Sequence, residues 1–294
     1  MATPSSYFLP HKASWPIGAS IGMTFLLAGF GNYLNGSSVG SPMMVLGAIV
    51  VATILFCWFS EVVSESVSGA YNHQVDMSFR WGMVWFIASE VMFFASFFGA
   101  LYYARVLSVD WLGGIGDPTL AGQTHELLWK SFEAVWPTNG PGHVGGHADG
   151  TFEAMGAFGI PLLNTLILLS SGATVTWAHQ GLLVNNRDQL IKGLAATVGL
   201  GFLFVAFQAY EYHHAYAELG LTMGTGIYGS TFFMLTGFHG MHVTIGAIML
   251  TVVLLRSMRG HFSPKHHFAF EAAAWYWHFV DVVWLGLYIF VYWL

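Results

Sequence analysis

Charged residues are scarce in this chain of 294 residues, because Asp, Glu, Lys and Arg together make up only 8% of it. A soluble domain carries roughly 25% charged residues, since its surface must be hydrated. With 9 Lys and Arg against 15 Asp and Glu, the sequence also lacks the basic stripe of a nucleic-acid-binding protein. The shortage of charge excludes a water-solvated fold and a nucleic-acid partner.

Cysteine is almost absent, since Cys57 is the single one. One thiol cannot form a disulfide within the chain, and it cannot alone supply a thiolate metal cluster. Any metal or cofactor chemistry must therefore rest on histidine, aspartate or glutamate. We expect no cleavable signal peptide, because residues 1–15 are polar and contain prolines, and the apolar run behind them is long enough to span a membrane.

Long apolar runs are abundant: 55% of the residues are hydrophobic, 17% are aromatic and the mean hydropathy is +0.59. A helix needs about 20 mostly apolar residues to cross roughly 30 Å of hydrocarbon. Seven runs meet this requirement, at 16–34, 42–60, 81–104, 155–179, 193–213, 229–255 and 271–294. The sequence therefore predicts an all-α membrane protein with seven transmembrane helices. In the first run we expect Gly18 and Gly22 to mark a close helix contact.

Lysine and arginine residues in the connecting segments predict the orientation, because they are enriched on the inner side of a membrane. With the N-terminus inside, only Arg105 and Lys130 lie outside. The inner residues are Lys12, Arg80, Arg187, Lys192, Arg256, Arg259 and Lys265. We therefore expect the N-terminus inside and the C-terminus outside. The connection at 106–154 is then a long outer loop rich in glycine and histidine, and such loops are commonly functional or mobile.

Glu90 is an ionisable residue inside the third run, in Trp85-Phe-Ile-Ala-Ser-Glu90-Val-Met-Phe-Phe94. At a rise of about 1.5 Å per residue it lies near the middle of the membrane. A bare carboxylate there costs several kcal/mol, so we expect Glu90 to be protonated, paired or hydrated. Two interpretations stay open: a proton-handling or gating group, and a neutral acid that is hydrogen-bonded to a neighbouring helix.

His239 and His242 lie three residues apart and so share a helix face. They could ligate one metal or partner Glu90. A metal would need further ligands from other helices, and candidates at a suitable depth are few, so hydrogen-bonded packing is the favoured interpretation. Adjacent histidines such as His266 and His267 point away from each other on a helix, which makes them poor chelates and suits a lipid interface or a partner surface.

The last run carries Glu271, His278 and Asp281. Acids within a membrane are costly and need partners. His278 and Asp281 are three residues apart, so they can pair on one face, which would stabilise the charged form of each. A haem would need axial ligands on facing helices, and the sequence shows no such paired spacing.

Candidate membrane anchors lie at the ends of two runs. Trp58 is near the end of the second run, Glu61 and Glu65 follow it, and Arg256 and Arg259 follow the sixth. Aromatic and basic residues at this level are the usual interface anchors. They also suit lipid headgroups, because arginine binds phosphate in a fork geometry. The anchor interpretation is favoured for any one of them.

Four segments resemble subunit III of the haem-copper cytochrome c oxidases. The longest is Lys265-His-His-Phe-Ala-Phe-Glu-Ala-Ala-Ala-Trp-Tyr-Trp-His-Phe-Val-Asp-Val-Val-Trp284, which is similar to the terminal helix of that family. The others are Gly229-Ser-Thr-Phe-Phe-Met-Leu-Thr-Gly-Phe-His-Gly-Met-His242, Pro161-Leu-Leu-Asn-Thr165 with Thr176-Trp-Ala-His179, and Ser89-Glu90-Val-Met-Phe-Phe94. The resemblance runs from about His11 to Leu294 and is weakest at 106–154.

The resemblance implies that the seven helices divide into a pair and a bundle of five, with lipids in a cleft between them. Residues 1–60 would hold the N-terminal segment and the pair, and residues 61–294 the bundle. Glu90 matches the carbodiimide-reactive carboxyl of the family. The positions implied for lipid binding are Trp58, Glu61, Glu65, His73, Arg80 and Arg256. Ser60 and Ser64 stand where some relatives carry arginine, which puts a second headgroup contact in doubt.

The resemblance further implies a core subunit of a proton-pumping terminal oxidase, which reduces oxygen to water with electrons from cytochrome c. Haem and copper are expected in the partner subunits I and II. For this chain we expect no metal, no catalytic residue and only phospholipids as bound cofactors. Its expected role is to stabilise subunit I and to keep proton uptake into it fast.

Two features refine this expectation. The length of the outer loop favours a bacterial inner membrane over the mitochondrial inner membrane. Both first helices are present, whereas related quinol oxidases lack them, and this favours the cytochrome c type. The alternative hypothesis is an independent proton-coupled transporter or channel that uses Glu90.

Overall fold

The computed structural model describes residues 14–116 and 121–294, and Lys12, which entered the prediction of orientation, lies outside them. Within the described residues the chain is helical and forms no strand. Seven of its helical segments are long and apolar enough to cross a membrane. The prediction of an all-α protein with seven spans is confirmed.

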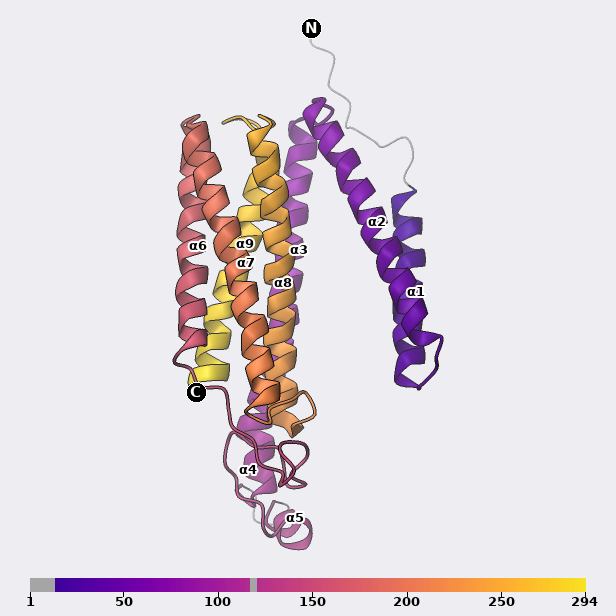
Figure 1. Cartoon of the computed structure of the whole chain (residues 1–294), viewed down its shortest axis with the longest axis vertical. Helices are drawn as coiled ribbons and strands as arrows, with labels where there is room; N and C mark the ends of the chain where they lie inside the picture. Colours follow the sequence, from indigo (N-terminus) through magenta and orange to yellow (C-terminus); the bar gives the residue numbers. More distant parts are fainter. Residues whose placement is uncertain (1–13, 117–120) are drawn as a thin grey trace. The chain divides into compact units, whose positions relative to one another are not determined.

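The spans are built from the helices labelled in Figure 1. Five are single helices: α1 (Trp15–Leu34), α2 (Gly40–Val67), α6 (Ile160–Leu183), α7 (Arg187–Ala217) and α8 (Gly226–Met258). The third span, His73–Leu112, joins α3 (His73–Tyr102), the π-helical segment η1 (Tyr103–Ser108) and α4 (Val109–Leu112). The last span, Phe268–Trp293, joins α9 (Phe268–Leu287) to the π-helical segment η2 (Tyr288–Trp293). A short helix, α5 (Ala121–Leu128), follows α4.

Local sequence signals explain where several helices begin. Gly159 has a φ of 94° directly before α6, and Pro161 sits in the first turn, where a missing N–H leaves no hydrogen bond unmade. α1 likewise has Pro16 in its first turn. Asn186 caps α7, because its side chain accepts a hydrogen bond of 3.2 Å from the backbone N–H of Gln189. These signals separate α6 from α7 by a short connection and make them packed neighbours.

The described chain forms two compact units that divide between Trp81 and Gly82. Unit 1 contains α1, α2 and the first turns of α3, and its two long helices pack backbone to backbone. A Cβ atom on Gly47 would lie 2.4 Å from the backbone nitrogen of Leu26, and one on Gly29 would lie 2.6 Å from that of Met44. Only glycine fits at such contacts, because a backbone cannot move away as a side chain can.

The predicted contact at Gly18 and Gly22 is part of the same interface. A Cβ atom on Gly18 would lie 2.6 Å from Ile54 Cδ1, and one on Gly22 would lie 2.8 Å from Val51 Cγ2. Both neighbours belong to α2. The expectation that these glycines mark a helix contact is confirmed.

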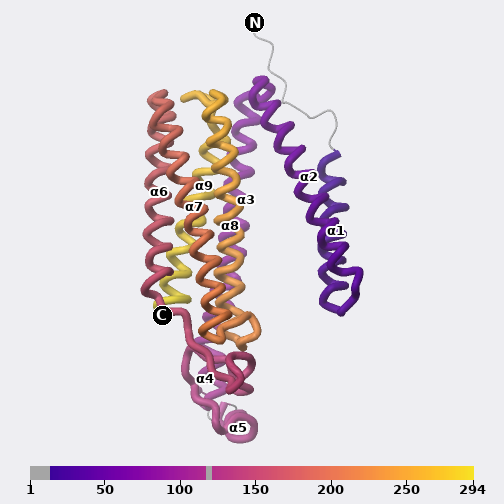
Figure 2. Tube along the Cα trace, in the orientation of Figure 1, coloured from indigo at the N-terminus to yellow at the C-terminus, as the bar shows by residue number. Residues whose placement is uncertain are grey.

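Unit 2, which begins at Gly82, contains the remaining helices, and α6 to α9 run side by side in it (Figures 1 and 2). Its core is centred on α9, where Trp277 and Trp284 are fully buried. The Trp277 indole N–H donates to Ser171 Oγ at 2.8 Å, and that of Trp284 donates to Thr165 Oγ1 at 2.9 Å. Both hydroxyls belong to α6, so polar contacts as well as packing join α6 to α9.

Glycines make room for the large rings of α9. A Cβ atom on Gly201 would lie 2.7 Å from Trp277 Cη2, and one on Gly246 would lie 2.8 Å from Trp277 Cε3. One indole ring thus fills space that α7 and α8 leave free. Gly201, which lies in the fifth apolar run, therefore has a packing role.

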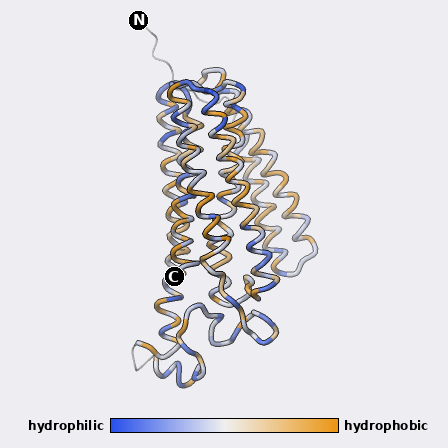
Figure 3. The backbone as a smooth tube through the Cα atoms, turned by 60° about the vertical axis from the view of Figure 1, so that its left-hand side comes forward, coloured by the Kyte–Doolittle hydropathy of each residue, from blue (hydrophilic) through white to orange (hydrophobic). Residues whose placement is uncertain are grey.

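The outer surfaces of the spans are apolar. Exposed side chains along them include Leu46, Phe56, Trp85, Phe202 and Val282. In Figure 3 hydrophobic residues follow the helices of unit 2, and hydrophilic residues gather towards the helix ends and in the connections. This is the pattern expected where hydrocarbon is the solvent of the middle of each helix.

The long connection between α4 and α6 is folded against the start of α8. The backbone N–H of Glu153 donates to Leu219 O at 2.9 Å, and that of Tyr228 donates to Thr138 O at 3.3 Å. Gly226 has a φ of 52°, and a Cβ atom on it would lie 2.2 Å from Asn139 O. The connection, seen beyond the ends of the long helices in Figure 2, is therefore packed rather than a loose tether.

Candidate functional site

Glu90 and His242 form a pair within unit 2. Glu90 lies on α3 and His242 on α8, and Glu90 Oε2 is 2.9 Å from His242 Nε2. The side chain of His242 is 6% exposed and that of Glu90 is 21% exposed. The pair therefore sits at the edge of the bundle, with the histidine inside and the carboxyl reaching towards the surface.

The hydrogen bonds of His242 determine which of its ring nitrogens carries a hydrogen. Nδ1 lies 2.6 Å from Phe238 O, and a carbonyl oxygen only accepts, so Nδ1 must be the donor. Nε2 then either accepts from a protonated Glu90 or, in the imidazolium, donates to an ionised Glu90. In both states one proton lies between Glu90 and His242, and the pair has no net charge.

Aromatic rings enclose His242 on several sides. Tyr276 of α9 is stacked on it with ring centroids 6.3 Å apart, and Phe94 of α3 meets it at 5.0 Å. Phe93 adds a third ring at 6.0 Å, and Phe86 stacks in turn on Tyr276 at 6.0 Å. This shell lowers the local dielectric constant, so a neutral pair is favoured over a lone charge. Chemically, the arrangement can hold one proton between two helices within the membrane.

His239 does not join this pair. It is fully buried, its Nε2 lies 3.2 Å from Val280 O, and its ring packs on Trp284 and Phe204. Of the two histidines on one helix face, only His242 reaches Glu90. Among the described residues, the group of His and acidic side chains close enough to share a metal includes neither of them.

His278 and Asp281 lie on one face of α9, but they are farther apart than a hydrogen bond. His278 Nδ1 is 3.9 Å from Asp281 Oδ2, while His278 Nε2 is 3.4 Å from Thr176 Oγ1. Asp281 instead packs against α6, where a Cβ atom on Gly172 would lie 2.3 Å from its Oδ2. The arrangement is a contact between α6 and α9, with Asp281 buried and His278 half exposed.

The structure reveals a further intramembrane carboxyl that sequence reasoning missed. Glu211 on α7 is fully buried and accepts a hydrogen bond of 2.6 Å from the Tyr292 hydroxyl of the last span. Nearby, the hydroxyl groups of Tyr212 and Thr236 lie 2.7 Å apart. The sequence could have indicated this residue, because an acidic residue within an apolar helix is a candidate functional group, and Glu211 meets this criterion as Glu90 does.

Two of the residues expected at a lipid site, Glu61 and Glu65, lie near the end of α2 in unit 1. The Tyr71 hydroxyl donates to Glu65 Oε2 at 2.6 Å, and the Trp15 indole N–H donates to Glu61. Burial and the hydrogen bond to Glu65 raise the pKa of Tyr71, so it stays a donor at physiological pH. These contacts connect the end of α2 to α1 and to the turn before α3.

The other expected residues differ in exposure. Trp58 is 37% exposed, which suits an interface anchor. Arg80 Nε lies 2.8 Å from Asp76 Oδ2, one turn away on α3, and His73 begins that helix. In unit 2, Arg256 is buried in the last turn of α8, with its guanidinium carbon 4.6 Å above the ring of Phe262.

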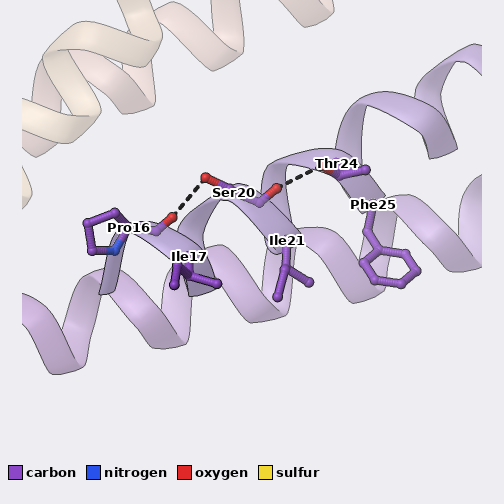
Figure 4. A pocket seen from close by; sticks show the side chains of 6 residues that line it. All are labelled: Pro16, Ile17, Ser20, Ile21, Thr24 and Phe25. Atoms are coloured by element: carbon purple, nitrogen blue, oxygen red, sulfur yellow. Dashed lines mark hydrogen bonds between the residues drawn. The ribbon is translucent and has the colours of Figure 1, made fainter. Parts of the chain in front are cut away.

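A shallow groove of about 400 Å³ runs along α1 (Figure 4). It is lined by Pro16, Ile17, Ser20, Ile21, Thr24 and Phe25. Ser20 Oγ donates to Pro16 O and Thr24 Oγ1 donates to Ser20 O, both at 2.8 Å. Because these hydroxyls are satisfied within the helix, the groove offers an apolar surface suited to an acyl chain, with no charged group for a headgroup.

Comparison with known proteins gives matches over nearly the whole chain. The family described as cytochrome c oxidase subunit III matches residues 5–128 and 125–294. Cytochrome c oxidase subunit 3 of Drosophila melanogaster is 42% identical over 296 residues, which cover 100% of this chain and 99% of the relative. The Formosania lacustris protein of the same name is 40% identical over 98% of this chain and 97% of its own length. That of Marchantia polymorpha is 40% identical over 98% and 96%.

These relatives leave one expectation without support and confirm another. The expectation without support is the bacterial source, which was inferred from the length of the outer loop. The three relatives come from eukaryotes, and each aligns with this chain over almost its full length. Their identity over both units and their shared name agree with the resemblance carried by the four sequence segments. The chain belongs to the cytochrome c oxidase subunit III family.

Proposed function

We propose that this chain is the subunit of a proton-pumping terminal oxidase that stabilises subunit I and keeps its proton uptake fast, without a redox centre of its own. As a subunit III, the chain is part of an oxidoreductase complex with other oxidase subunits. The proposal adds that haem and copper lie in subunits I and II and that cytochrome c donates electrons to the complex.

The Glu90–His242 pair is the observation that carries this proposal. It holds one proton at the edge of the bundle, with 21% of the Glu90 side chain exposed. A group that is neutral overall can lie next to hydrocarbon or a partner helix at low cost, and it still exchanges a proton between two atoms. We propose that Glu90 faces the proton-conducting partner and that His242 maintains its protonated state.

Lipid binding is the second part of the proposed role. The residues proposed to hold phospholipids are Trp58, Glu61, Glu65, His73, Arg80 and Arg256. Support comes from Glu65, His73 and Arg256, which lie in the first or last turn of a helix, near the level of the headgroups, and from the fork geometry of arginine. His239, His278 and Asp281 are proposed to act in packing. The predicted orientation, N-terminus inside and C-terminus outside, is part of this proposal.

The decisive experiment removes this subunit from the purified complex and restores it. We expect the depleted complex to start with normal oxygen reduction, to take up protons more slowly and to become inactive after fewer turnovers. Adding back the chain should restore both properties. Full turnover stability and unchanged proton uptake in the depleted complex would contradict the proposal.

Reconstitution of the isolated chain tests the alternative of an independent transporter. We expect liposomes that contain the chain alone to show no proton flux above that of empty vesicles. A flux that is lost in the Glu90→Gln variant would favour the transporter hypothesis.

A further inference from the structure

Three side chains with metal-ligating atoms converge in unit 2, away from the Glu90–His242 pair. His179 lies near the end of α6, His267 directly precedes α9, and Glu271 lies one turn into α9. One ligand atom from each lies within 4.8 Å of the other two. The cluster therefore joins two helices that are distant in sequence.

The hydrogen bond of His267 fixes the chemistry of its ring. Nδ1 lies 3.0 Å from Ser263 O, and since a carbonyl only accepts, Nδ1 carries the hydrogen. The Nε2 atom then presents its lone pair to the cluster, where Glu271 Oε1 lies 3.2 Å away. A backbone carbonyl that holds the distal nitrogen of a histidine is the usual support of a metal-binding imidazole.

His179 provides an independent observation. Its Nε2 atom is buried and has no hydrogen-bond partner among the described residues. Its ring is held between His267, with centroids 5.7 Å apart, and Phe270 at 5.2 Å. A buried ring nitrogen without a partner is costly. Because a ring nitrogen of His179 lies within 4.8 Å of the other two ligand atoms, a group bound among the three would remove this cost.

His267 Nε2 and Glu271 Oε1 can lie 3.2 Å apart only if something positive lies between them. With its hydrogen on Nδ1, His267 offers a lone pair at Nε2, and a lone pair and a carboxylate oxygen are both acceptors that repel each other at this distance. A proton can bridge the pair of His267 and Glu271, but it leaves His179 without a partner. A divalent metal ion satisfies all three atoms at once and neutralises the carboxylate.

We propose that His179, His267 and Glu271 bind a divalent transition-metal ion, for which Zn²⁺ is the best match. Two imidazoles and one carboxylate are a donor set that zinc prefers, whereas Mg²⁺ and Ca²⁺ take mainly oxygen ligands. The fourth position is left to water or to another ligand. Such a site would cross-link the end of α6 to the start of α9. It revises the expectation that His267, with His266, belongs to a lipid interface or a partner surface.

Zinc binding by the full-length chain, in the complex with which it purifies, tests this site. The preparation is stripped with a chelator and dialysed against micromolar Zn²⁺ in the presence of excess Mg²⁺, and zinc is counted by mass spectrometry. We expect the unmodified chain to bind one more zinc ion than His179→Asn and His267→Asn, with an affinity at least about 100-fold higher, since even losing a supporting contact costs 10- to 100-fold.

His266→Asn is the matched control, because His266 is the exposed neighbour of His267 and is not in the cluster. It should bind as much zinc as the unmodified chain. Equal zinc in all four proteins, or an equal loss in His266→Asn, would overturn the site. If the cluster variants do not fold, X-ray absorption at the zinc edge of the unmodified chain decides: two imidazoles at about 2.0–2.1 Å support the site, and their absence refutes it.

Discussion

Removing the side chain of Glu90 should destabilise unit 2 far more than neutralising it. In Glu90→Ala, His242 Nε2 loses its partner while its side chain remains only 6% exposed. A buried polar atom left without a hydrogen bond costs about 1–3 kcal/mol. In Glu90→Gln, the amide N–H₂ can donate to Nε2, because Nδ1 remains the donor to Phe238 O. We expect the free energy of unfolding of Glu90→Gln to fall by less than about 1 kcal/mol.

Thermal unfolding of the purified protein in detergent, followed by tryptophan fluorescence, measures this difference. Trp277 and Trp284 are fully buried in the same unit and report on its unfolding. With a shift of about 2–4 °C per kcal/mol for a chain of this size, Glu90→Ala should lower the Tm by about 2–12 °C. Glu90→Gln should stay within about 4 °C of the unmodified protein.

A double-mutant cycle isolates the contact from the loss of packing. His242→Ala removes a buried ring and is expected to be costly by itself. If the two residues are coupled, the double variant Glu90→Ala/His242→Ala should lose less free energy of unfolding than the two single variants lose together. The difference should be about 0.5–3 kcal/mol. Strict additivity, or equal effects of Gln and Ala at position 90, would refute the shared-proton geometry.

Three further outcomes follow from particular contacts. Gly172→Ala should destabilise the chain by about 1–3 kcal/mol in the same unfolding assay, because its Cβ would lie 2.3 Å from Asp281 Oδ2; an unchanged Tm would contradict this contact. Gly47→Ala should cost a similar amount, since its Cβ would lie 2.4 Å from the backbone nitrogen of Leu26; full stability would mean that α1 and α2 pack otherwise. Arg256→Ala should reduce the anionic lipid retained by the purified complex, as counted by mass spectrometry, and shorten its active life; unchanged lipid content would remove Arg256 from the lipid site.

The helical class and the number of spans were predictable because hydropathy is a local property. Hydrocarbon selects apolar residues segment by segment, whatever the neighbouring segments are. Hydropathy predicted the ends of the helices less accurately than their number. The second apolar run ends at residue 60, whereas α2 continues through Glu61 and Glu65 to Val67. A helix can extend into the polar interface, where its side chains meet water and headgroups while its backbone remains hydrogen-bonded.

The sequence predicted the hydrogen-bond partner of Glu90 only as a set of alternatives. The spacing of His239 and His242 indicated a shared face and a possible partner in Glu90, but it gave no reason to choose between the two histidines. In the structure His242 faces α3, while His239 faces the backbone of α9 at Val280. Positions three apart on a helix differ by about 60° in direction, which is enough to reach different neighbours in a bundle.

The cluster of His179, His267 and Glu271 shows the same limit more sharply. The sequence places His267 next to His266, and adjacency predicts that these two are a poor chelate. It says nothing of His179, which lies 88 positions before His267 and reaches it only because α6 packs against α9. Glu211 and Tyr292 are likewise brought together from α7 and the last span.

The sequence by itself determined that this chain is a seven-span membrane protein with costly acids inside, and its segments identified the family. These properties depend on composition and on the order of residues within one segment, because each helix by itself must be apolar enough to lie in hydrocarbon. The tertiary structure alone decided which acid meets which partner: Glu90 with His242, Glu211 with Tyr292, and Asp281 against Gly172. The physical reason is that a buried polar group is satisfied by atoms of other helices, and their rotation and depth are set by the packing of the whole bundle.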